Sequence, residues 1–386
     1  MDKPIRVLHV LVCLDSGGVE TLLLNFLSRL PERIHFDFLV SHNAKRDELA
    51  LEKGSKVFVV PREIQVAPWK YPRYISGLLQ EYGYHVVHFH RLAFSGSVMK
   101  AVKNSGATVR ISHCHHTQFQ EPGFWKPLIY FLYHSTFNRY HLWKHATHIL
   151  ACSNDAGRFL MGPHWHRSAK CKLLLNGIPL DEVVGRMAGT TRDALCQMYG
   201  IPREAIVLGN FSRMSPVKNL PFLLKIFACL AKRDPRYVLF IAGDGALRQQ
   251  LVSQVQEARL EHRVFMPGYC KNPVELAGRL FDAFCLPSLA EGLPVSLIEA
   301  VAGGLHSVCS DTITRDITAR FPERITPLSL KAAPDVWADA VEKAFSLKVS
   351  NEDGAALVRS ASMTIESQLG ELIAVYETAL RQTEAG

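Results

Sequence analysis

Short apolar segments alternate with longer amphipathic segments along the chain, and this alternation occurs in two separate series. Several of the short segments, such as "VLFIA" at 238–242 and "AFCL" at 283–286, are apolar throughout, as expected of parallel strands covered on both faces. Strands that alternate with helices form doubly wound α/β domains. The sequence therefore predicts an α/β fold with two such domains.

The predicted strands also indicate where one domain ends and the next begins. An Asn-Gly turn and a proline in "NGIPLDE" (176–182) separate the two series. We predict an N-terminal domain over 1–178 and a C-terminal domain over 179–363, with a terminal helix near 364–386 that packs back on the first domain. The strands are expected at 6–12, 36–40, 57–60, 86–89, 109–112, 148–152 and 172–175, and then at 206–211, 238–242, 264–266, 283–287 and 306–309.

Composition restricts the class of protein. Hydrophobic residues make up 48% of the chain and charged residues 21%, as is usual for a soluble globular protein. No apolar run reaches the roughly 18 residues of a spanning helix, and "IRVLHVLVCL" (5–14) is expected to be a buried strand rather than a signal peptide. The nine cysteines include no CxxC pair, which favours reduced thiols over a disulfide framework or a zinc site.

Positive charge is concentrated in the first half. Residues 1–178 hold 22 Lys+Arg and 12 Asp+Glu (22 − 12 = +10), whereas residues 179–386 hold 22 and 24 (22 − 24 = −2). Fifteen of the 17 histidines also lie in the first half. We therefore expect the first domain to meet an anionic partner: nucleic acid, an anionic membrane surface or a phosphorylated substrate.

Two loops that follow predicted strands have the character of phosphate-binding loops. Gly17 and Gly18 come between the first strand and a helix, where backbone N–H groups can approach an anion closely, although a tight turn is the alternative. In "GNFSRMSPVKN" (209–219), Arg213 and Lys218 precede a helix, and no carboxylate lies near them in sequence. Charge-assisted hydrogen bonds from these cations can hold a pyrophosphate; a solvated basic loop is the alternative.

The segment "SLAEGLPVSLIEA" (288–300) places two carboxylates on either side of a helix start. Glu291 precedes the turn, Pro294 suits the first helical position, and Glu299 lies inside the helix, which we expect to end at Gly303-Gly304. Free backbone N–H groups before the helix would face an anion, and the carboxylates would accept hydrogen bonds from hydroxyls. A nucleotide sugar offers both, although Glu291 as a helix cap and Glu299 as a surface residue remain possible.

These residues resemble a known family. Glu291 to Glu299 is similar to the E-x7-E signature of retaining GT-B glycosyltransferases of family four, from the branch that assembles bacterial capsular polysaccharide, exopolysaccharide or O-antigen. Further blocks resemble the family in the same order along nearly the whole chain. They are "GGVE" (17–20), "HVVHFH" (85–90), "RISHCHHT" (110–117), "ACSNDAG" (151–157), "NGIPL" (176–180), "FSRMSPVKN" (211–219) and "AGDG" (242–245).

The resemblance implies a GT-B fold and a role for each matching residue. Arg213 and Lys218 would hold the diphosphate of the sugar donor. Glu291 would contact the transferred sugar, and Glu299 the ribose. The remaining donor contacts would come from the backbone at Gly292, Leu293, Pro294 and Val295, from Gly17 and Gly18, and, near the base, from Gly243, Asp244 and 266–269.

The histidine loop is expected to face the reaction centre through His113 or His115, and the pattern does not decide between them. Because alternate residues of a strand share one face, a metal site there is conceivable, but no acidic ligand lies nearby and the family works without bound metal. We therefore expect no cofactor and no metal. The chain departs from the family pattern at His116, at His306 and at Thr314-Arg315. The last two departures weaken the inferred acceptor and late-loop contacts but leave the diphosphate contacts untouched.

A basic aromatic segment at 124–148 lies within a stretch, Pro122 to Asn154, that has no acidic residue. Such a helix can lie in a membrane interface; a core helix and RNA binding are the alternatives, and no nucleic-acid-binding module accompanies it. The residues that we expect to contact an acceptor or a membrane are His116, Trp125, Lys126, Arg139 and Lys144.

Together these features predict a retaining glycosyltransferase that moves a hexosyl or N-acetylhexosaminyl group from a nucleotide-diphosphate sugar, most simply a UDP-sugar, to a lipid-linked or glycan acceptor. We expect a cytoplasmic enzyme at the inner face of the cell membrane, with no nucleic-acid partner. The alternatives are a sugar-nucleotide epimerase or hydrolase on the same fold, and a non-catalytic scaffold attached to the membrane.

Overall fold

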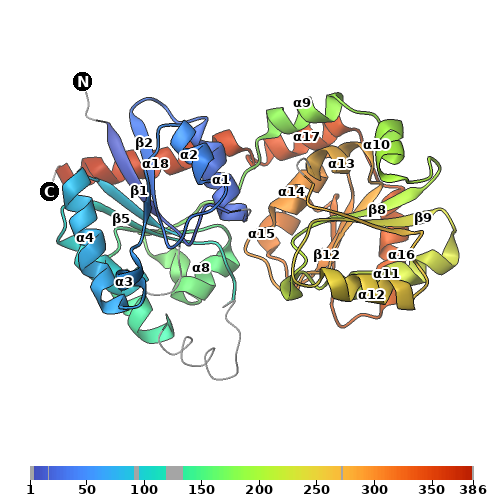
Figure 1. The fold of residues 1–386 in the computed structure, drawn as a ribbon, viewed down its shortest axis with the longest axis horizontal. Coiled ribbons are helices and arrows are strands. Elements are labelled where there is room, and N and C mark those ends of the chain that lie inside the picture. The colour runs from blue at the N-terminus through green and yellow to red at the C-terminus, as the bar shows by residue number, and fades with distance from the viewer. Residues whose placement is uncertain (1–3, 16, 91–94, 119–133, 271–272, 385–386) are drawn as a thin grey trace. The chain divides into compact units, whose positions relative to one another are not determined.

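The computed structural model describes residues 4–15, 17–90, 95–118, 134–270 and 273–384. The chain forms two compact units, one of Met1–Asn176 with Ile365–Gly386 and one of Gly177–Thr364. Each unit is a parallel sheet with helices on both faces (Figure 1), so the predicted pair of doubly wound domains is confirmed. The chain passes from the first unit to the second within two residues of the predicted boundary.

The first unit is built on a seven-stranded sheet in the order β3-β2-β1-β4-β5-β6-β7, in which every pair of neighbours is parallel. Side chains on both faces are buried along most strands, which explains why these segments are apolar throughout. The strands are β1 (Ile5–Val10), β2 (Ile34–Val40), β3 (Val57–Val59), β4 (Val86–Phe89), β5 (Val109–Cys114), β6 (His148–Ala151) and β7 (Cys171–Leu173).

Helices cover both faces of this sheet (Figure 1). Helix α1 contacts α18 on one face, and α5 contacts both α4 and α7 on the other. The helical segments are α1 (Gly18–Leu27), α2 (Asp47–Glu52), α3 (Arg62–Gln65), η1 (Pro68–Lys70), α4 (Tyr71–Tyr82), α5 (Ser95–Lys103), the π-helix η2 (His134–Asn138), α7 (Arg139–His145), α8 (Asn154–Met161), η3 (Trp165–Arg167) and α18 (Ile365–Glu384).

Helix α18 returns the end of the chain to the first unit. Its apolar residues recur with helical spacing, and they join the core formed by α1, β1, β2, β4 and β5. Arg29 Nε on the turn after α1 donates to Glu366 Oε1 at 2.8 Å. The Tyr376 hydroxyl lies 2.7 Å from His88 Nδ1 in the core. The buried apolar residues of α18 are Ile365, Leu369, Leu372, Val375, Tyr376 and Ala379.

Replacing Tyr376 by phenylalanine should lower the free energy of unfolding by about 1–2 kcal/mol, because the His88 ring would lose its buried hydrogen-bond partner while the packed volume stays nearly the same. Denaturant unfolding followed by circular dichroism measures this. The matched control is Tyr269→Phe, since Tyr269 is 73% exposed, and it should leave the unfolding free energy unchanged. Equal stability of the Tyr376→Phe and wild-type proteins would show that the contact contributes nothing.

The second unit has a six-stranded parallel sheet in the order β10-β9-β8-β11-β12-β13. Helices α11, α12 and α16 cover one face, and α9, α13, α14 and α17 cover the other (Figure 1). The strands are β8 (Ile206–Phe211), β9 (Tyr237–Ala242), β10 (Val264–Gly268), β11 (Ala283–Leu286), β12 (Ser307–Ser310) and β13 (Ile325–Leu328). The helices are α9 (Leu180–Ala188), α10 (Arg192–Tyr199), η4 (Pro216–Lys218), α11 (Leu220–Arg233), α12 (Arg248–Glu257), α13 (Pro273–Arg279), α14 (Val295–Ala302), α15 (Arg315–Thr318), α16 (Pro334–Phe345) and α17 (Asn351–Ser360).

Candidate functional site

The candidate site of the second unit lies where the strand order reverses. Strand β8 pairs with β9 on one side and with β11 on the other, so the chain winds in opposite directions from this point. In open α/β sheets, ligands bind in the crevice outside the carboxyl ends of the two strands at such a point. The loops that leave these ends are 212–219 and 287–294, and they contain Arg213, Lys218 and Glu291.

Hydrogen bonds tie the two loops together. The backbone N–H of Leu289 donates to Val217 O at 2.8 Å, and Asn219 Nδ2 donates to Pro287 O at 3.1 Å. Asn219 adopts the left-handed conformation (φ 52°), which asparagine tolerates better than most residues, and helix α11 starts at the next residue. The loops are therefore held at a fixed separation by contacts that need no ligand.

Lys218 and Glu291 meet across these loops. Lys218 Nζ donates to Glu291 Oε1 at 2.6 Å, and the side chains are 19% and 12% exposed. Although no carboxylate lies near Lys218 in sequence, Glu291 neutralises it from 73 residues away. The structure thus brings together two predicted site residues, and it adds a mutual ion pair that the sequence analysis missed.

Arg213 lies on the first of these loops with its side chain exposed. Its guanidinium forms no ion pair with any residue that the structure describes, so it can accept an anionic partner. The neighbouring Met214 N–H donates to Asp244 O at 2.9 Å. This contact places the predicted Gly243–Asp244 segment beside Arg213, at the carboxyl end of β9.

Gly243 is at a position where only glycine fits. Its φ is 144°, and a Cβ there would overlap the carbonyl oxygen of Ser212. Its N–H donates to Gly268 O at 2.7 Å, which joins this segment to the end of β10 and so to the predicted 266–269 segment. The Asp244 carboxylate is exposed, and its Oδ1 accepts from the Gly245 N–H at 2.7 Å. The predicted base-side residues therefore lie together at one edge of the sheet.

Helix α14 begins just after the second loop. Its first helical residue is Val295, and Pro294 is the capping residue before it, so the prediction that Pro294 is the first helical residue is wrong by one position. The helix ends at Ala302, directly before Gly303-Gly304, as predicted, and Gly304 has a φ of 75°. The first N–H groups of a helix have no partner within it, which makes the segment from Gly292 to Val295 suited to an anion. Leu293 is buried beneath it.

Glu299 lies within α14 and is only partly exposed. Burial raises the pKa of its carboxyl group to about 8, because the surrounding protein disfavours the charged form. At neutral pH the group is therefore mostly protonated and can both donate and accept a hydrogen bond. Carboxyl groups with a strongly shifted pKa are common in functional sites.

In the first unit, the predicted residues lie at the carboxyl ends of β1 and β5. Helix α1 starts at Gly18, and a Cβ on Gly17 would overlap the carboxylate of Glu20 from the first turn of that helix. His113 is the fifth residue of β5, and His115 follows the strand. Both histidines are buried, at 3% and 8% exposure, so the structure leaves open which of them faces a substrate.

The predicted membrane-contact residues are only partly within the described chain. Trp125 and Lys126 lie outside it, and His116, which is described, is partly exposed. Arg139 Nε and Nη2 donate to Leu160 O and Phe159 O at 3.0 Å each, at the end of α8. These bonds argue against the predicted membrane role of Arg139, because its guanidinium is already committed to protein carbonyls.

Lys144 is exposed on α7, in a row of aromatic side chains that face solvent. Phe137, Tyr140 and Trp143 are 46%, 57% and 53% exposed, and their spacing of three residues places them along one side of the helical segment. Lys144 Nζ lies over the Tyr140 ring, 5.6 Å from its centroid. This part of the segment is consequently a surface helix rather than a core helix.

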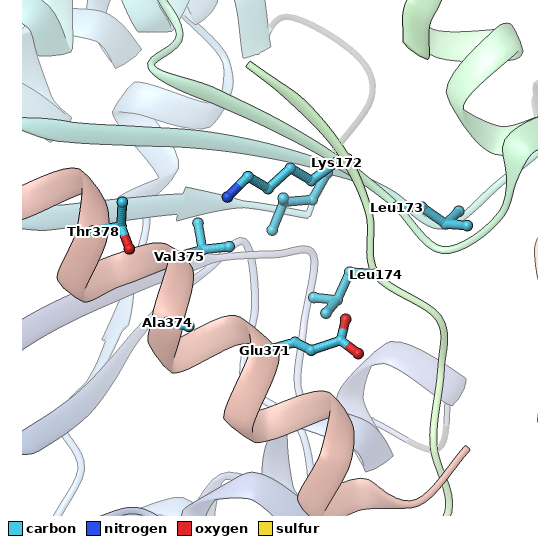
Figure 2. Close-up of a pocket in the computed structure, with 8 residues that line it drawn as sticks. Lys172, Leu173, Leu174, Glu371, Ala374, Val375 and Thr378 are labelled. Atoms are coloured by element: carbon cyan, nitrogen blue, oxygen red, sulfur yellow. The ribbon is translucent and has the colours of Figure 1, made fainter. Parts of the chain in front are cut away.

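Two hollows lie elsewhere in the first unit. A pocket of about 240 Å³ between β6, β7 and α18 contains none of the predicted residues; Lys172, Val375 and Thr378 are among those lining it (Figure 2). An open groove beside α4 is lined by Trp69, which is 76% exposed, and by Lys70 and Arg73. Among the described helices, none combines the length and the apolar character that crossing a bilayer requires.

Comparison with known proteins agrees with this geometry. Residues 16–182 match the family described as Glycosyltransferase Family 4, and residues 192–317 match Glycosyl transferases group 1. The HepE protein of Anabaena, solved in complex with UDP, aligns over 97% of this chain and all of its own, with a TM-score of 0.75 and 17% identity. The fold is accordingly that of the GT-B class.

Relatives that are similar in sequence identify the family more narrowly than the fold does. The putative glycosyltransferase EpsF of Bacillus subtilis is 35% identical over 343 residues, which cover 88% of this chain and 87% of EpsF. The chain therefore belongs to the EpsF family of glycosyltransferases. An Escherichia coli relative, UDP-Gal:alpha-D-GlcNAc-diphosphoundecaprenol alpha-1,3-galactosyltransferase, is 22% identical over 80% of this chain and 79% of its own.

Proposed function

We propose that this glycosyltransferase transfers a hexosyl or N-acetylhexosaminyl group from a UDP-sugar to a lipid-linked acceptor, with retention of the anomeric configuration, in the assembly of a bacterial surface polysaccharide. The observation that carries the proposal is the Lys218–Glu291 ion pair at the switch point of the second sheet. It sets a cation and a carboxylate side by side at the place where a donor would present its diphosphate and its sugar.

Binding of the donor would exchange the partners of this pair. Lys218 would turn from Glu291 to the diphosphate, together with the exposed Arg213, while the released Glu291 accepts hydrogen bonds from sugar hydroxyls. The N–H groups at the start of α14 and the closely packed Gly243–Gly245 segment would hold the rest of the nucleotide. Because Lys218 and Glu291 hold each other in the free protein, these two side chains stay ordered without a ligand.

The chemistry follows from this clamp. As the bond between the anomeric carbon and the phosphate oxygen lengthens, negative charge grows on the leaving diphosphate, and two cations placed in advance stabilise it. We infer front-face attack by the acceptor hydroxyl, whose proton passes to the leaving phosphate. This route gives retention without a covalent intermediate on the enzyme.

The UDP-sugar and the lipid-linked acceptor are suggested by relatives. The E. coli relative is named for UDP-Gal and for a diphosphoundecaprenol acceptor, and HepE was solved with UDP. A lipid-linked acceptor requires access to a membrane surface, and the excess positive charge of residues 1–178 suits an anionic one. We therefore place the enzyme at the inner face of the cell membrane.

The experiment that tests the proposed function has two stages. A thermal-shift screen with UDP-, GDP- and ADP-sugars should raise the melting temperature with UDP-sugars alone. The stabilising donor is then incubated with and without membranes that carry lipid-linked sugars, and the anomeric configuration of the product is determined by NMR. An inverted product would refute retention. Conversion of the donor at the same rate without acceptor would support an epimerase or hydrolase instead.

The exposed row on α7 supplies a prediction about membrane contact. Lys144→Gln should lower binding to phosphatidylglycerol vesicles about 5-fold, because one basic residue near an anionic surface contributes about 1 kcal/mol. Vesicle co-sedimentation measures it at low salt. The control is Lys225→Gln on α11, where the lysine is also exposed but belongs to the other unit. If both variants bind as the wild type does, the row does not face the membrane.

A further inference from the structure

Five histidines form a cluster on one face of the first sheet. Strand register places His9 opposite His88. His90 lies two residues after His88, and the register of β4 with β5 leads to His113 beside it, with His115 two residues further on. Since alternate residues of a strand share one face, all five rings point to the face covered by α18. Neighbouring ring centroids lie 4.0–5.6 Å apart. All are at most 8% exposed. The members of this histidine cluster are His9, His88, His90, His113 and His115.

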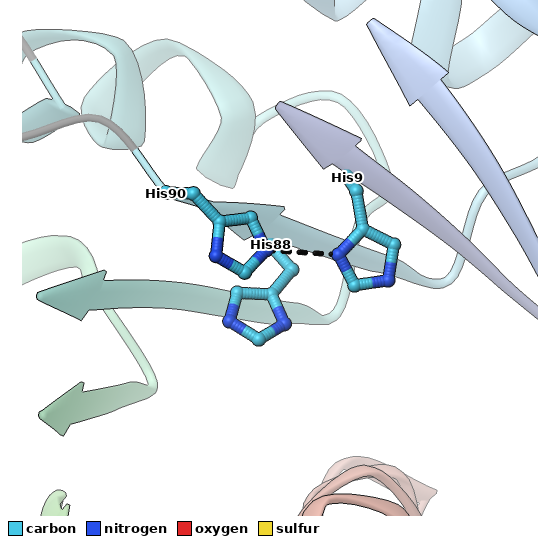
Figure 3. Close-up of side chains that lie close together, drawn as sticks. All are labelled: His9, His88 and His90. Atoms are coloured by element: carbon cyan, nitrogen blue, oxygen red, sulfur yellow. Dashed lines mark hydrogen bonds between the residues drawn. The ribbon is translucent and has the colours of Figure 1, made fainter. Parts of the chain in front are cut away.

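Hydrogen bonds link only part of the cluster. His9 Nδ1 lies 2.9 Å from His90 Nε2 (Figure 3), and His90 Nδ1 lies 3.0 Å from His115 Nε2. His113 is different, because neither of its ring nitrogens has a hydrogen-bond partner among the residues that the structure describes, although both are buried. A neutral imidazole carries one N–H and one lone pair, so this ring holds an unpaired buried donor, which is unfavourable. Packing alone does not explain it.

Burial lowers the pKa of each ring in the cluster below the ordinary value for histidine, and neighbouring rings lower several of them further.

We propose that His90, His113 and His115 bind one divalent transition-metal ion, such as Zn²⁺. One ring nitrogen from each of the three lies within 4.8 Å of the others. His90 Nδ1 and His115 Nε2 are 3.0 Å apart, close to the roughly 3.3 Å that separates two nitrogens on a tetrahedral Zn²⁺ with bonds of about 2.0–2.1 Å. The lone pair of His113 is free to complete the set.

A second triad, His9 with His88 and His90, satisfies the same distance limit but suits an ion less well. His9 and His88 are fully buried, whereas His115 follows the end of β5 and is 8% exposed, which offers an entry path. With the ion on His90 Nδ1, the Nε2–H of that ring donates to His9 Nδ1 (Figure 3). Metal-binding histidines usually donate their other N–H in this way. Because the triads share His90, we expect one ion.

The ion would join the carboxyl ends of β4 and β5, and three protein ligands leave its fourth position open. This inference departs from the expectation that the protein binds no metal. It does not concern the diphosphate clamp, whose residues belong to the second unit. It therefore stands or falls independently of the proposed function.

The full-length protein, freed of metal with a chelator and dialysed, is titrated with Co²⁺. We expect one equivalent to give the visible absorption of a tetrahedral site, and Zn²⁺ to displace it. His113→Gln should weaken Co²⁺ binding at least about 100-fold, since changes to outer partners alone typically cost 10–100-fold. The control is His164→Gln, an exposed histidine of the same unit, which should bind as the wild type does.

Circular dichroism of the metal-free proteins shows whether each variant folds, and His115→Gln at the strand end replaces His113→Gln if that one does not. No Co²⁺ spectrum at one equivalent overturns the proposal. An unchanged affinity in the folded His113→Gln or His115→Gln protein overturns it as well, because the ion would then lie elsewhere. A rise in the wild-type melting temperature with Zn²⁺, absent in the variant, supports it.

Discussion

Replacing Lys218 by alanine is expected to lower the rate of sugar transfer by about 10²–10³-fold, because the leaving diphosphate loses one of the two cations that stabilise its developing charge. Initial rates measured with the donor from the thermal-shift screen and a lipid-linked acceptor test this. UDP binding, measured by calorimetry, should weaken as well, because the cation also contacts the bound nucleotide. The matched control is Lys225→Ala on α11, an exposed lysine seven residues further along the chain, which should keep the wild-type rate.

Loss of Lys218 also removes an ion pair of the partly buried Glu291, so activity must be separated from stability. The double variant Lys218→Ala/Glu291→Gln also removes the negative charge that the ion pair with Lys218 had neutralised. Its melting temperature should recover toward that of the wild type, while transfer stays low. Transfer at the wild-type rate in Lys218→Ala would remove Lys218 from the mechanism, and recovery of activity in the double variant would mean that the pair is only structural.

The fold was predictable from the sequence because parallel strands buried on both faces have a simple signature. The twelve predicted strands all correspond to observed ones, from β1 to β12. The strand that was missed, β13 (Ile325–Leu328), is short, contains Pro327 and lies at the sheet edge. A proline is tolerated there because an edge strand has N–H groups without partners, but it removes the strand's signature from the sequence.

The loops of the candidate site were also predictable, but the pairing within them was not. Arg213, Lys218 and Glu291 were identified from their positions after strands and from the family pattern. That Lys218 meets Glu291 depends on β8 lying beside β11, and strand order is not written in local sequence. The histidine cluster had a local signal, since His88 and His90, like His113 and His115, alternate along a strand. Their meeting with His9 again depends on which strands are neighbours.

The affinity for UDP should rise with pH through Glu299. Burial raises the pKa of this carboxyl group to about 8, so the free protein holds it protonated at neutral pH. If ribose hydroxyls donate to the carboxylate, binding favours the charged form and releases a proton. Affinity then increases up to about 10-fold per pH unit between pH 6 and 8, and it levels off above pH 8. Calorimetry in buffers of different ionisation enthalpy measures the proton release.

The same group has an opposite effect on the free protein. Its folded pKa lies above the unfolded value of about 4.3, so its contribution to stability is complete below that pH and is lost as the pH rises through about 8. Above pH 8, Glu299→Gln should therefore unfold at a higher denaturant concentration than the wild type. Its affinity for UDP should depend on pH only through the phosphate, whose second pKa is about 6. Glu257→Gln, at an exposed position on α12, should match the wild type in both profiles. If the affinity for UDP depends on pH in the same way in Glu299→Gln and in the wild type, UDP binding releases no proton from Glu299. Glu299 would then not contact the nucleotide as a carboxylate.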